Sequence, residues 1–482
     1  MSRKQIIGWI VTIVLTLLCW CLPTSAFGVE GLTVIHQRII ALFVFAACMW
    51  ICEAMPIWAT SVVIMVLMLL TTSDSMLGCF AGEAIGTPIS YKTIMHEFAN
   101  PTVMLFMGGF VLAIGATKYR LDANLARCVI GLFGRKPRMV MLGFITITAL
   151  LSMFMSNTAT AAMMMAILAP VLNSLPESDK RGKVGLALAI PVAANIGGMG
   201  TPIGTPPNVV AVGYLGEKMG IDITFGQWMM VMVPLVIVIL ALAWLFLSTR
   251  FRSNRQEIVI TISGQWDHSF KAIVVYVTFA VTILLWLFGK DLFGVNSYVV
   301  ALIPFAVFCV FGIFDKADLA RIDWDVLWLV AGGFALGTGI SETHLAELLV
   351  GAIPFSSWAA LPILLGSGLL CLLMSTFMSN SATAALLIPI LGVVAGAMSV
   401  PDAMGAAPLL PYGGSPTVII GLAVAASLAM ALPISTPPNA IAYSKGFICQ
   451  KEMVVTGLFV GLIGFLISYA VLIFVGKAGL FI

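Results

Sequence analysis

Runs of about twenty apolar residues follow one another along most of this chain, and they constrain its fold more than any other feature. Hydrophobic residues make up 61% of the 482 positions, whereas charged residues make up only 9%. A helix needs about 20 apolar residues to cross a bilayer, and soluble domains carry about 25% charged residues. The sequence therefore predicts an all-α polytopic membrane protein, located in the inner or plasma membrane.

The apolar runs predict eleven transmembrane spans and two units of a different kind. The spans are expected near residues 8–26, 37–53, 57–72, 101–117, 184–214, 226–249, 268–289, 297–314, 324–340, 412–444 and 453–477. The two other units cover 139–175 and 358–399, and each has a short polar phrase in its middle. The first span could instead be a secretory signal, but its apolar run is long for a signal core and many spans follow.

Basic residues in the short loops predict how the chain is oriented, because cytoplasmic loops carry an excess of Lys and Arg. They precede the first span, flank 139–175 and surround a linker at 250–267, whereas none occurs between Arg321 and Lys445. With the basic clusters in the cytoplasm, the N-terminus lies inside, the C-terminus lies outside, and the linker is cytoplasmic. The unit 139–175 then starts and ends inside, while 358–399 starts and ends outside.

A unit that returns to its own side is either a pair of full spans or a re-entrant hairpin. Each arm of 139–175 has about 17 residues, which makes about 25 Å of helix. That length is at or below what a hydrocarbon core of about 30 Å requires, and no residues remain for an external turn. The hairpin is favoured, and it places the polar phrase at membrane depth.

Three phrases of the first half recur in the second half in the same order. They are "GGFVLAIG" at Gly108 and "GGFALGTG" at Gly332, "SNTATAA" at Ser156 and "SNSATAA" at Ser379, and "GTPPN" at Gly204 and "STPPN" at Ser435. The charge pattern puts the two copies in opposite orientations. We therefore divide the chain into an extra span over 1–36, a first inverted repeat over 37–249 and a second over 268–482. This architecture favours a secondary transporter, although channels can share it.

Paired prolines interrupt two of the predicted spans. Proline lacks a backbone N–H and cannot continue a helix, so 184–214 is expected to unwind at Gly204 to Asn208. The same reasoning breaks 412–444 at Ser435 to Asn439. Non-helical backbone at membrane depth is tolerated only where protein buries it or a cavity wets it.

The two hairpin tips and the two broken spans can meet at the membrane midplane. Ser and Asn are favoured at helix starts, so Ser156-Asn157 and Ser379-Asn380 are expected to begin the second arm of each hairpin. Helix N-termini attract carboxylates, and carbonyl and hydroxyl oxygens suit a hard cation such as sodium. The four phrases contain no Lys, Arg or His, so a multiply charged anion there needs bound cations. The pattern predicts cation-coupled anion transport.

Other interpretations apply to parts of this pattern. Small residues often serve only the close packing of helices, which suits the "GGF" phrases or a single polar phrase but not two matched sets. Asp315 to Asp325 is predicted to be a solvated cytoplasmic loop. No nucleophile–base pair and no metal-ligand spacing occurs in the sequence, so an enzyme is not expected. No basic tract of the nucleic-acid type is present, so no nucleic-acid partner is expected.

The paired "SNT"-type tips and paired "TPPN"-type breaks resemble the divalent anion/sodium symporter family, which carries succinate, related dicarboxylates and citrate. The resemblance covers nearly the whole chain. It implies a dicarboxylate bound between the tips and breaks, with one sodium site on each side. It also implies a scaffold domain that holds a homodimer together and a transport domain that moves across the bilayer like an elevator.

The resemblance also implies which residues make contact. The substrate would be bound by Ser156, Asn157, Thr158, Thr205, Pro206, Ser379, Asn380, Ser381, Thr436 and Pro437. The first sodium would be held by Ser152, Ser156, Asn157 and the Gly204 carbonyl, and the second by Ser375, Asn380 and the Ser435 carbonyl. Ser381 stands where the family more commonly has threonine. Serine keeps the hydroxyl and lacks the methyl group.

The sequence thus predicts a secondary active transporter that imports a C4 dicarboxylate together with sodium ions. A sodium-independent dicarboxylate or citrate exchanger is the alternative within transport, because the family contains such exchangers with similar tips. An anion channel is a further alternative, and it would conduct passively without accumulation of substrate.

Overall fold

The computed structural model describes residues 3–82, 85–258, 266–352, 359–401 and 407–479. Within these ranges the chain is helical almost throughout, and its one β-type pairing is an isolated bridge between Ser73 and Ile89. Residues 259–265 of the predicted linker and residue 358 of the second predicted hairpin lie outside the described residues.

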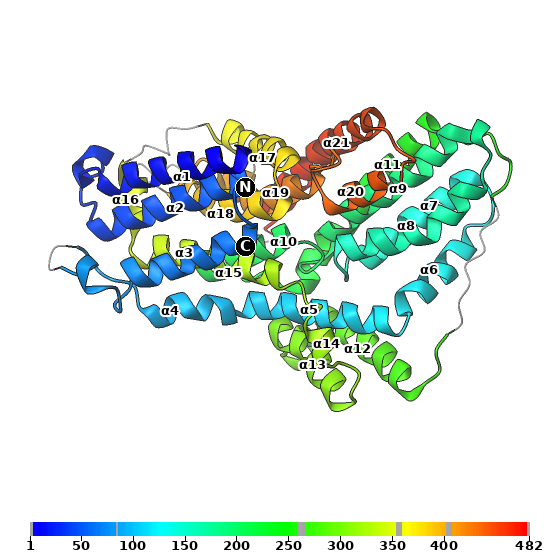
Figure 1. Cartoon of the computed structure of the whole chain (residues 1–482), viewed down its shortest axis with the longest axis horizontal. Helices are drawn as coiled ribbons and strands as arrows, with labels where there is room; N and C mark the ends of the chain where they lie inside the picture. Colours follow the sequence, from blue (N-terminus) through cyan, green and yellow to red (C-terminus); the bar gives the residue numbers. More distant parts are fainter. Residues whose placement is uncertain (1–2, 83–84, 259–265, 353–358, 402–406, 480–482) are drawn as a thin grey trace.

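Figure 1 shows the helices coloured in chain order, and they divide into those before and those after the predicted linker in the sequence. Before it come α1 (Arg3–Cys21), α2 (Val34–Cys52), α3 (Ile57–Thr71), α4 (Tyr91–His96), α5 (Pro101–Lys118), α6 (Leu121–Leu132), α7 (Pro137–Ser152), α8 (Asn157–Ser174), α9 (Lys180–Gly197), α10 (Pro206–Met219) and α11 (Phe225–Arg250). After it come α12 (Phe270–Phe293), α13 (Ser297–Val310), α14 (Lys316–Leu319), α15 (Trp324–Glu342), α16 (Leu345–Ala352), α17 (Ala360–Phe377), α18 (Asn380–Ala397), α19 (Gly414–Leu428), α20 (Pro437–Ser444) and α21 (Gln450–Lys477). Short 3-10 turns are η1 (Thr24–Phe27), η2 (Gly78–Phe80), η3 (Glu97–Ala99), η4 (Glu177–Asp179), η5 (Gly198–Gly200) and η7 (Leu410–Tyr412).

Nine helical segments of the described chain are long and apolar enough to cross a membrane. This confirms the predicted all-α membrane fold. Two of the nine are α17 and α18, the arms of the second predicted hairpin, each with 18 residues. The arms α7 and α8 of the first are 16 and 18 residues long.

A sharp turn joins the two arms of each hairpin, and a serine side chain caps the helix that follows the turn. Ser156 precedes α8, and its Oγ accepts a hydrogen bond from the Ala159 backbone N–H at 3.3 Å. Ser379 precedes α18 and accepts in the same way from the Ala382 N–H at 3.1 Å. These bonds satisfy one of the orphan N–H groups that every helix start leaves.

Two other helices stop and restart at the proline pairs. The chain leaves helical geometry after α9 and η5 and restarts in α10 with Pro206, while the second interruption separates α19 from α20, which begins with Pro437. Proline suits the first position of a helix because its missing N–H would be unpaired there. The unwound turns are held by Asn208, which donates to the Gly198 and Thr201 carbonyls, and by Asn439, which donates to the Met430 and Leu432 carbonyls.

Packing brings the two halves of the chain into contact around these interruptions. Helix α20 packs beside α8 and α9, and α10 packs against α18 and α19 (Figure 1). Helix α9 is buried from Gly182 to Gly197, and its small residues allow close approach. A methyl group on Gly197 would lie 2.5 Å from Ala149 Cα on α7. This arrangement places the first hairpin beside the second broken helix, and the second hairpin beside the first broken helix.

Candidate binding cavity

The four interruptions surround one cavity of about 650 Å³. This volume lies within the range of roughly 300 to 1,000 Å³ that is typical of small-molecule sites. Residues of α3, α5 and the start of α15 complete the wall. The site is therefore lined by the four interruptions together with these three helices.

All ten residues proposed to bind substrate line this cavity. They are Ser156, Asn157, Thr158, Thr205, Pro206, Ser379, Asn380, Ser381, Thr436 and Pro437, and Gly204 and Ser435 line it as well. Thr205 and Thr436 are buried, while Thr158 is exposed. The remaining predicted sodium residues, Ser152 and Ser375, are both fully buried and lie in contact with the two asparagines.

Around Asn157 the structure gathers oxygen atoms from three segments. Ser152 Oγ lies 2.5 Å from Asn157 Oδ1 and donates to the Ala194 carbonyl at 2.8 Å. With its amide turned over, Asn157 instead donates to the Gly204 and Ala194 carbonyls, each at 3.2 Å. In either orientation the Asn157 amide lies beside the Ser152 hydroxyl and the Gly204 and Ala194 carbonyls, and oxygen atoms of this kind are the ligands that a hard cation takes,. The residues present fit a sodium ion here.

The second half of the chain repeats this arrangement around Asn380. Ser375 Oγ lies 2.8 Å from Asn380 Oδ1 and 3.1 Å from the Ala426 carbonyl, to which it also donates. Ser435 lines the cavity nearby, and its hydroxyl donates to the Thr376 carbonyl at 2.6 Å. The same serine–asparagine–carbonyl geometry therefore occurs twice, once in each half.

Helix N-termini, rather than basic side chains, bring positive partial charge to the cavity. Helices α8, α10, α18 and α20 begin at residues that line it, and helix N-termini carry partial positive charge,. Among the described residues of the lining, only Asp323 and Asp325 are charged, and both are acidic. The described chain also contains no group of three or more His, Cys, Asp and Glu residues placed to hold a metal ion.

Sequence reasoning missed three polar residues of the wall. Asn195 of α9 is buried, and its Nδ2 donates to Thr436 Oγ1 at 3.1 Å and to Asn439 Oδ1 at 3.2 Å. An amide inside the run "PVAANIGG" was the one signal that pointed to it.

Asp323 and Asp325, at the end of the predicted loop 315–325, also line the cavity, a role that the prediction of a solvated loop did not include. Asp325 is exposed, so the cavity reaches solvent at the start of α15. Burial, together with the charge of Asp325, raises the pKa of Asp323 to about 6. Asp315 and Asp318 do not line the cavity. Both form ion pairs with Lys118, at 3.3 and 2.6 Å.

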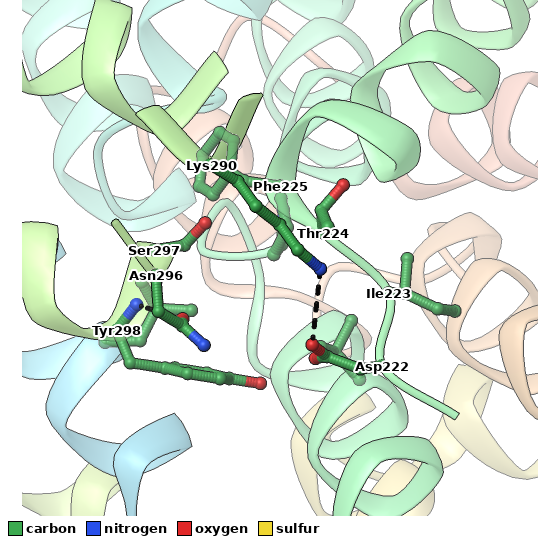
Figure 2. A pocket seen from close by; sticks show the side chains of 11 residues that line it. Asp222, Ile223, Thr224, Phe225, Lys290, Asn296, Ser297 and Tyr298 are labelled. Carbon is green, nitrogen blue, oxygen red and sulfur yellow. Dashed lines mark hydrogen bonds and ion pairs between the residues drawn. The ribbon is translucent and has the colours of Figure 1, made fainter. Parts of the chain in front are cut away.

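A second, much smaller hollow lies between the loop before α11 and the loop that joins α12 to α13. Figure 2 shows its lining, where Lys290 and Asp222 form an ion pair at 3.6 Å and Asn296 Oδ1 accepts from the Tyr298 N–H. Its volume of about 20 Å³ has room for roughly one water molecule,. A dicarboxylate does not fit, so the large cavity is the candidate site.

Comparison with known proteins supports a transporter. Two curated relatives are sodium-dependent dicarboxylate transporters named SdcS. The one from Staphylococcus saprophyticus is 29% identical over 98% of this chain and 92% of its own, and the one from Staphylococcus aureus is 30% identical over 97% and 91%.

Solved transporters share the fold at low identity. The YdaH transporter of Alcanivorax borkumensis has a TM-score of 0.55 at 14% identity, over 92% of this chain and 98% of its own. MtrF of Neisseria gonorrhoeae has a TM-score of 0.52 at 11% identity, over 86% and 94%.

One family model matches residues 3–478, almost the whole chain, and its description is the transmembrane region of sodium:sulfate symporters. This confirms the resemblance to the divalent anion/sodium symporters and the expectation of a transporter rather than an enzyme. The chain belongs to the sodium:sulfate symporter family.

Proposed function

We propose that this protein imports a C4 dicarboxylate such as succinate into the cell, coupled to sodium ions. The observation that carries the proposal is the convergence of four helix N-termini and two serine–asparagine oxygen clusters on one cavity without a basic side chain. An anion with two carboxylates needs countercharge there, and sodium at the clusters provides it. The names of the two SdcS relatives support both the substrate class and the coupling ion.

Each carboxylate of the substrate would meet one half of the site. The first hairpin tip, Ser156 to Thr158, and the second, Ser379 to Ser381, each offer hydroxyl and amide donors at a helix start. Thr205 and Thr436 add hydroxyls from the broken helices. Helix N-termini bind carboxylates through free N–H groups, and this replaces the arginine that many anion sites use.

The two sodium ions would lie behind the tips. Ser152, Asn157 and the Gly204 carbonyl surround the first, and Ser375, Asn380 and the Ser435 carbonyl the second, with Ser156 at the edge of the first. The first site is closely packed: a methyl group on Gly198 would lie 2.6 Å from Asn157 Oδ1 and 3.0 Å from the Gly204 carbonyl oxygen. Sodium that binds here lowers the cost of placing a dianion in the cavity.

Movement would follow an elevator scheme built on the inverted repeats 37–249 and 268–482. The two hairpins with the broken helices form the proposed moving body, and helices including α3, α5, α13 and α15 form the proposed scaffold, which is expected to hold a homodimer. The cavity reaches solvent beside Asp325, at the end of α15 that the basic-residue pattern places in the cytoplasm,. The structure would then represent an inward-open state, with a cytoplasmic N-terminus and an external C-terminus.

Uptake of labelled succinate into proteoliposomes tests the proposal. We expect uptake against a concentration gradient when sodium is higher outside, and none when sodium is replaced by choline. Uptake driven by internal dicarboxylate without sodium would instead support the exchanger, and passive equilibration without accumulation would support a channel.

A further inference from the structure

Asn195 is the point at which the first half of the site contacts the second. Its side chain is 1% exposed, and both hydrogens of its amide are used. One bond goes to Thr436 Oγ1 at 3.1 Å and the other to Asn439 Oδ1 at 3.2 Å, both in the broken helix of the second half. A residue of α9 thus holds the restart of α20, more than two hundred positions further along the chain.

These bonds determine what the Thr436 hydroxyl can do. Its oxygen accepts from the Asn195 amide and also from the Asn439 backbone N–H at 3.3 Å. A hydroxyl has two lone pairs and one hydrogen, so two accepted bonds leave the hydrogen as the group available to a ligand. Thr436 lines the cavity, and its hydroxyl is therefore fixed as a donor toward an anion.

The backbone beside Asn195 belongs to the first oxygen cluster. The carbonyl of the preceding residue, Ala194, accepts from Ser152 Oγ at 2.8 Å and faces the Asn157 amide at 3.2 Å in its turned orientation. An ion held by Ser152 and Asn157 would therefore order the segment from which the Asn195 side chain projects. One covalent step separates the first sodium cluster from the group that positions Thr436.

The second half of the chain has no matching link among the described residues. Ala426 corresponds to Ala194, because its carbonyl accepts from Ser375 as the Ala194 carbonyl does from Ser152. The next residue, Ser427, donates only locally, to the Ala423 carbonyl at 3.0 Å.

The first half also lacks a match for the groups that accept from Asn195. Thr205 makes no side-chain bond at the start of α10, whereas Thr436 Oγ1 accepts from the Asn439 N–H at the start of α20. The buried Oδ1 of Asn208 has no hydrogen-bond partner, whereas Oδ1 of Asn439 accepts from Asn195. The connection therefore runs from the first cluster to the second half and not in the reverse direction.

We propose that Asn195 is a positioning residue that couples sodium occupancy of the first cluster to substrate binding at Thr436. The inference rests on the proposed function, because it requires a site that binds both sodium and a dicarboxylate. Sodium at Ser152 and Asn157 orders the backbone at Ala194, Asn195 then holds the Thr436 oxygen, and the hydroxyl hydrogen meets the substrate carboxylate. The geometry makes the coupling asymmetric between the two clusters.

The test is succinate affinity measured by calorimetry on the purified full-length protein, at low and at saturating sodium. For Asn195→Ala we expect the affinity at saturating sodium to fall about three- to tenfold, the size of one hydrogen bond. Ser427→Ala, the matched change in the other half, should leave the affinity as in the wild type. Sodium binding measured without succinate should be unchanged in both variants.

A double-mutant cycle with Thr436→Val separates positioning from a general structural effect. If Asn195 acts through Thr436, Asn195→Ala adds no further loss to Thr436→Val, since contacting residues are not additive. Asn195→Asp supplies a second variant of the same size. Its carboxylate accepts the Thr436 hydrogen instead of donating, so we expect a loss larger than that of Asn195→Ala.

Two outcomes would overturn the inference while the proposed function stands. One is a wild type whose succinate affinity rises with sodium and an Asn195→Ala protein that behaves identically. The other is full additivity of Asn195→Ala and Thr436→Val. If the succinate affinity of the wild type did not depend on the sodium concentration, the proposed function itself would be overturned, and the inference with it.

Discussion

A buried ion pair lies on the far side of the cavity from Asp325. Its removal tests how much paired buried charge contributes to the free energy of unfolding. Lys218 of α10 lies 3.6 Å from Glu97, and the two side chains are 13% and 6% exposed. Lys218 Nζ also donates to Thr338 Oγ1 at 2.5 Å, and Asn100 donates to Glu97 Oε2 at 2.9 Å. The Thr338 hydroxyl donates to the other Glu97 oxygen. The pair therefore joins α10 to α15 and to the turn before α5.

Lys218→Met removes the cation and leaves the Glu97 carboxylate buried. At 3.6 Å and an effective dielectric constant of about 20, the lost attraction is about 5 kcal/mol before desolvation is counted,. Loss of one partner of a buried pair costs about 3 to 5 kcal/mol. Because the bonds from Thr338 and Asn100 to Glu97 remain, we expect the cost here toward the lower end of that range. With an unfolding entropy of about 2 cal/mol/K per residue over 482 residues, the unfolding midpoint should fall by about 3 to 5 °C,.

The assay is thermal unfolding of the purified protein in detergent, followed by tryptophan fluorescence. The double variant Glu97→Gln/Lys218→Met removes both charges of the pair and should recover most of the lost midpoint. An unchanged midpoint in Lys218→Met would refute the reasoning, as would a double variant no more stable than the single one. Lys218 lies on the proposed moving body and Glu97 on the proposed scaffold, so the change should also weaken this conformation relative to the opposite one.

Three further predictions follow from the cavity. Asn157→Ala and Asn380→Ala should each abolish sodium-driven succinate uptake while size-exclusion chromatography shows folded protein, and near-normal uptake in both would refute the site assignment. Gly198→Ala forces its new methyl to within 2.6 Å of Asn157 Oδ1 and should weaken sodium binding at least tenfold by calorimetry, whereas Gly216→Ala on α10, with open space around it, should not. The raised pKa of about 6 means that Asp323 is charged only above that pH. The carboxylate then repels a dianion in the cavity, so Asp323→Asn should bind succinate more tightly than wild type above pH 6. The two proteins should converge below it, and a constant affinity ratio across this range would contradict the assignment.

Much of the local structure could be predicted from the sequence because it depends on neighbouring residues. Ser156 and Ser379 cap helices through bonds to N–H groups three positions ahead, and Pro206 and Pro437 begin helices because proline suits that position,. The all-helical membrane fold follows from the apolar runs alone.

Features that depend on packing between distant segments could not be read in this way. The bond from Asn195 to Thr436 joins α9 to α20, and no local pattern pairs these residues. Asp323 and Asp325 follow a charged segment in which acidic and basic residues balance, and no local pattern indicated that the placement of α15 brings them to the cavity wall. The amphipathic helix α6 occupies a segment, 121–132, that the apolar runs did not identify.

Import of succinate together with sodium requires that each flux depend on the other solute. Labelled sodium and labelled succinate are followed together in the same proteoliposomes, with each solute omitted in turn. We predict that inward sodium flux requires succinate and that inward succinate flux requires sodium. Succinate flux of undiminished rate with sodium absent from both sides of the membrane would contradict it.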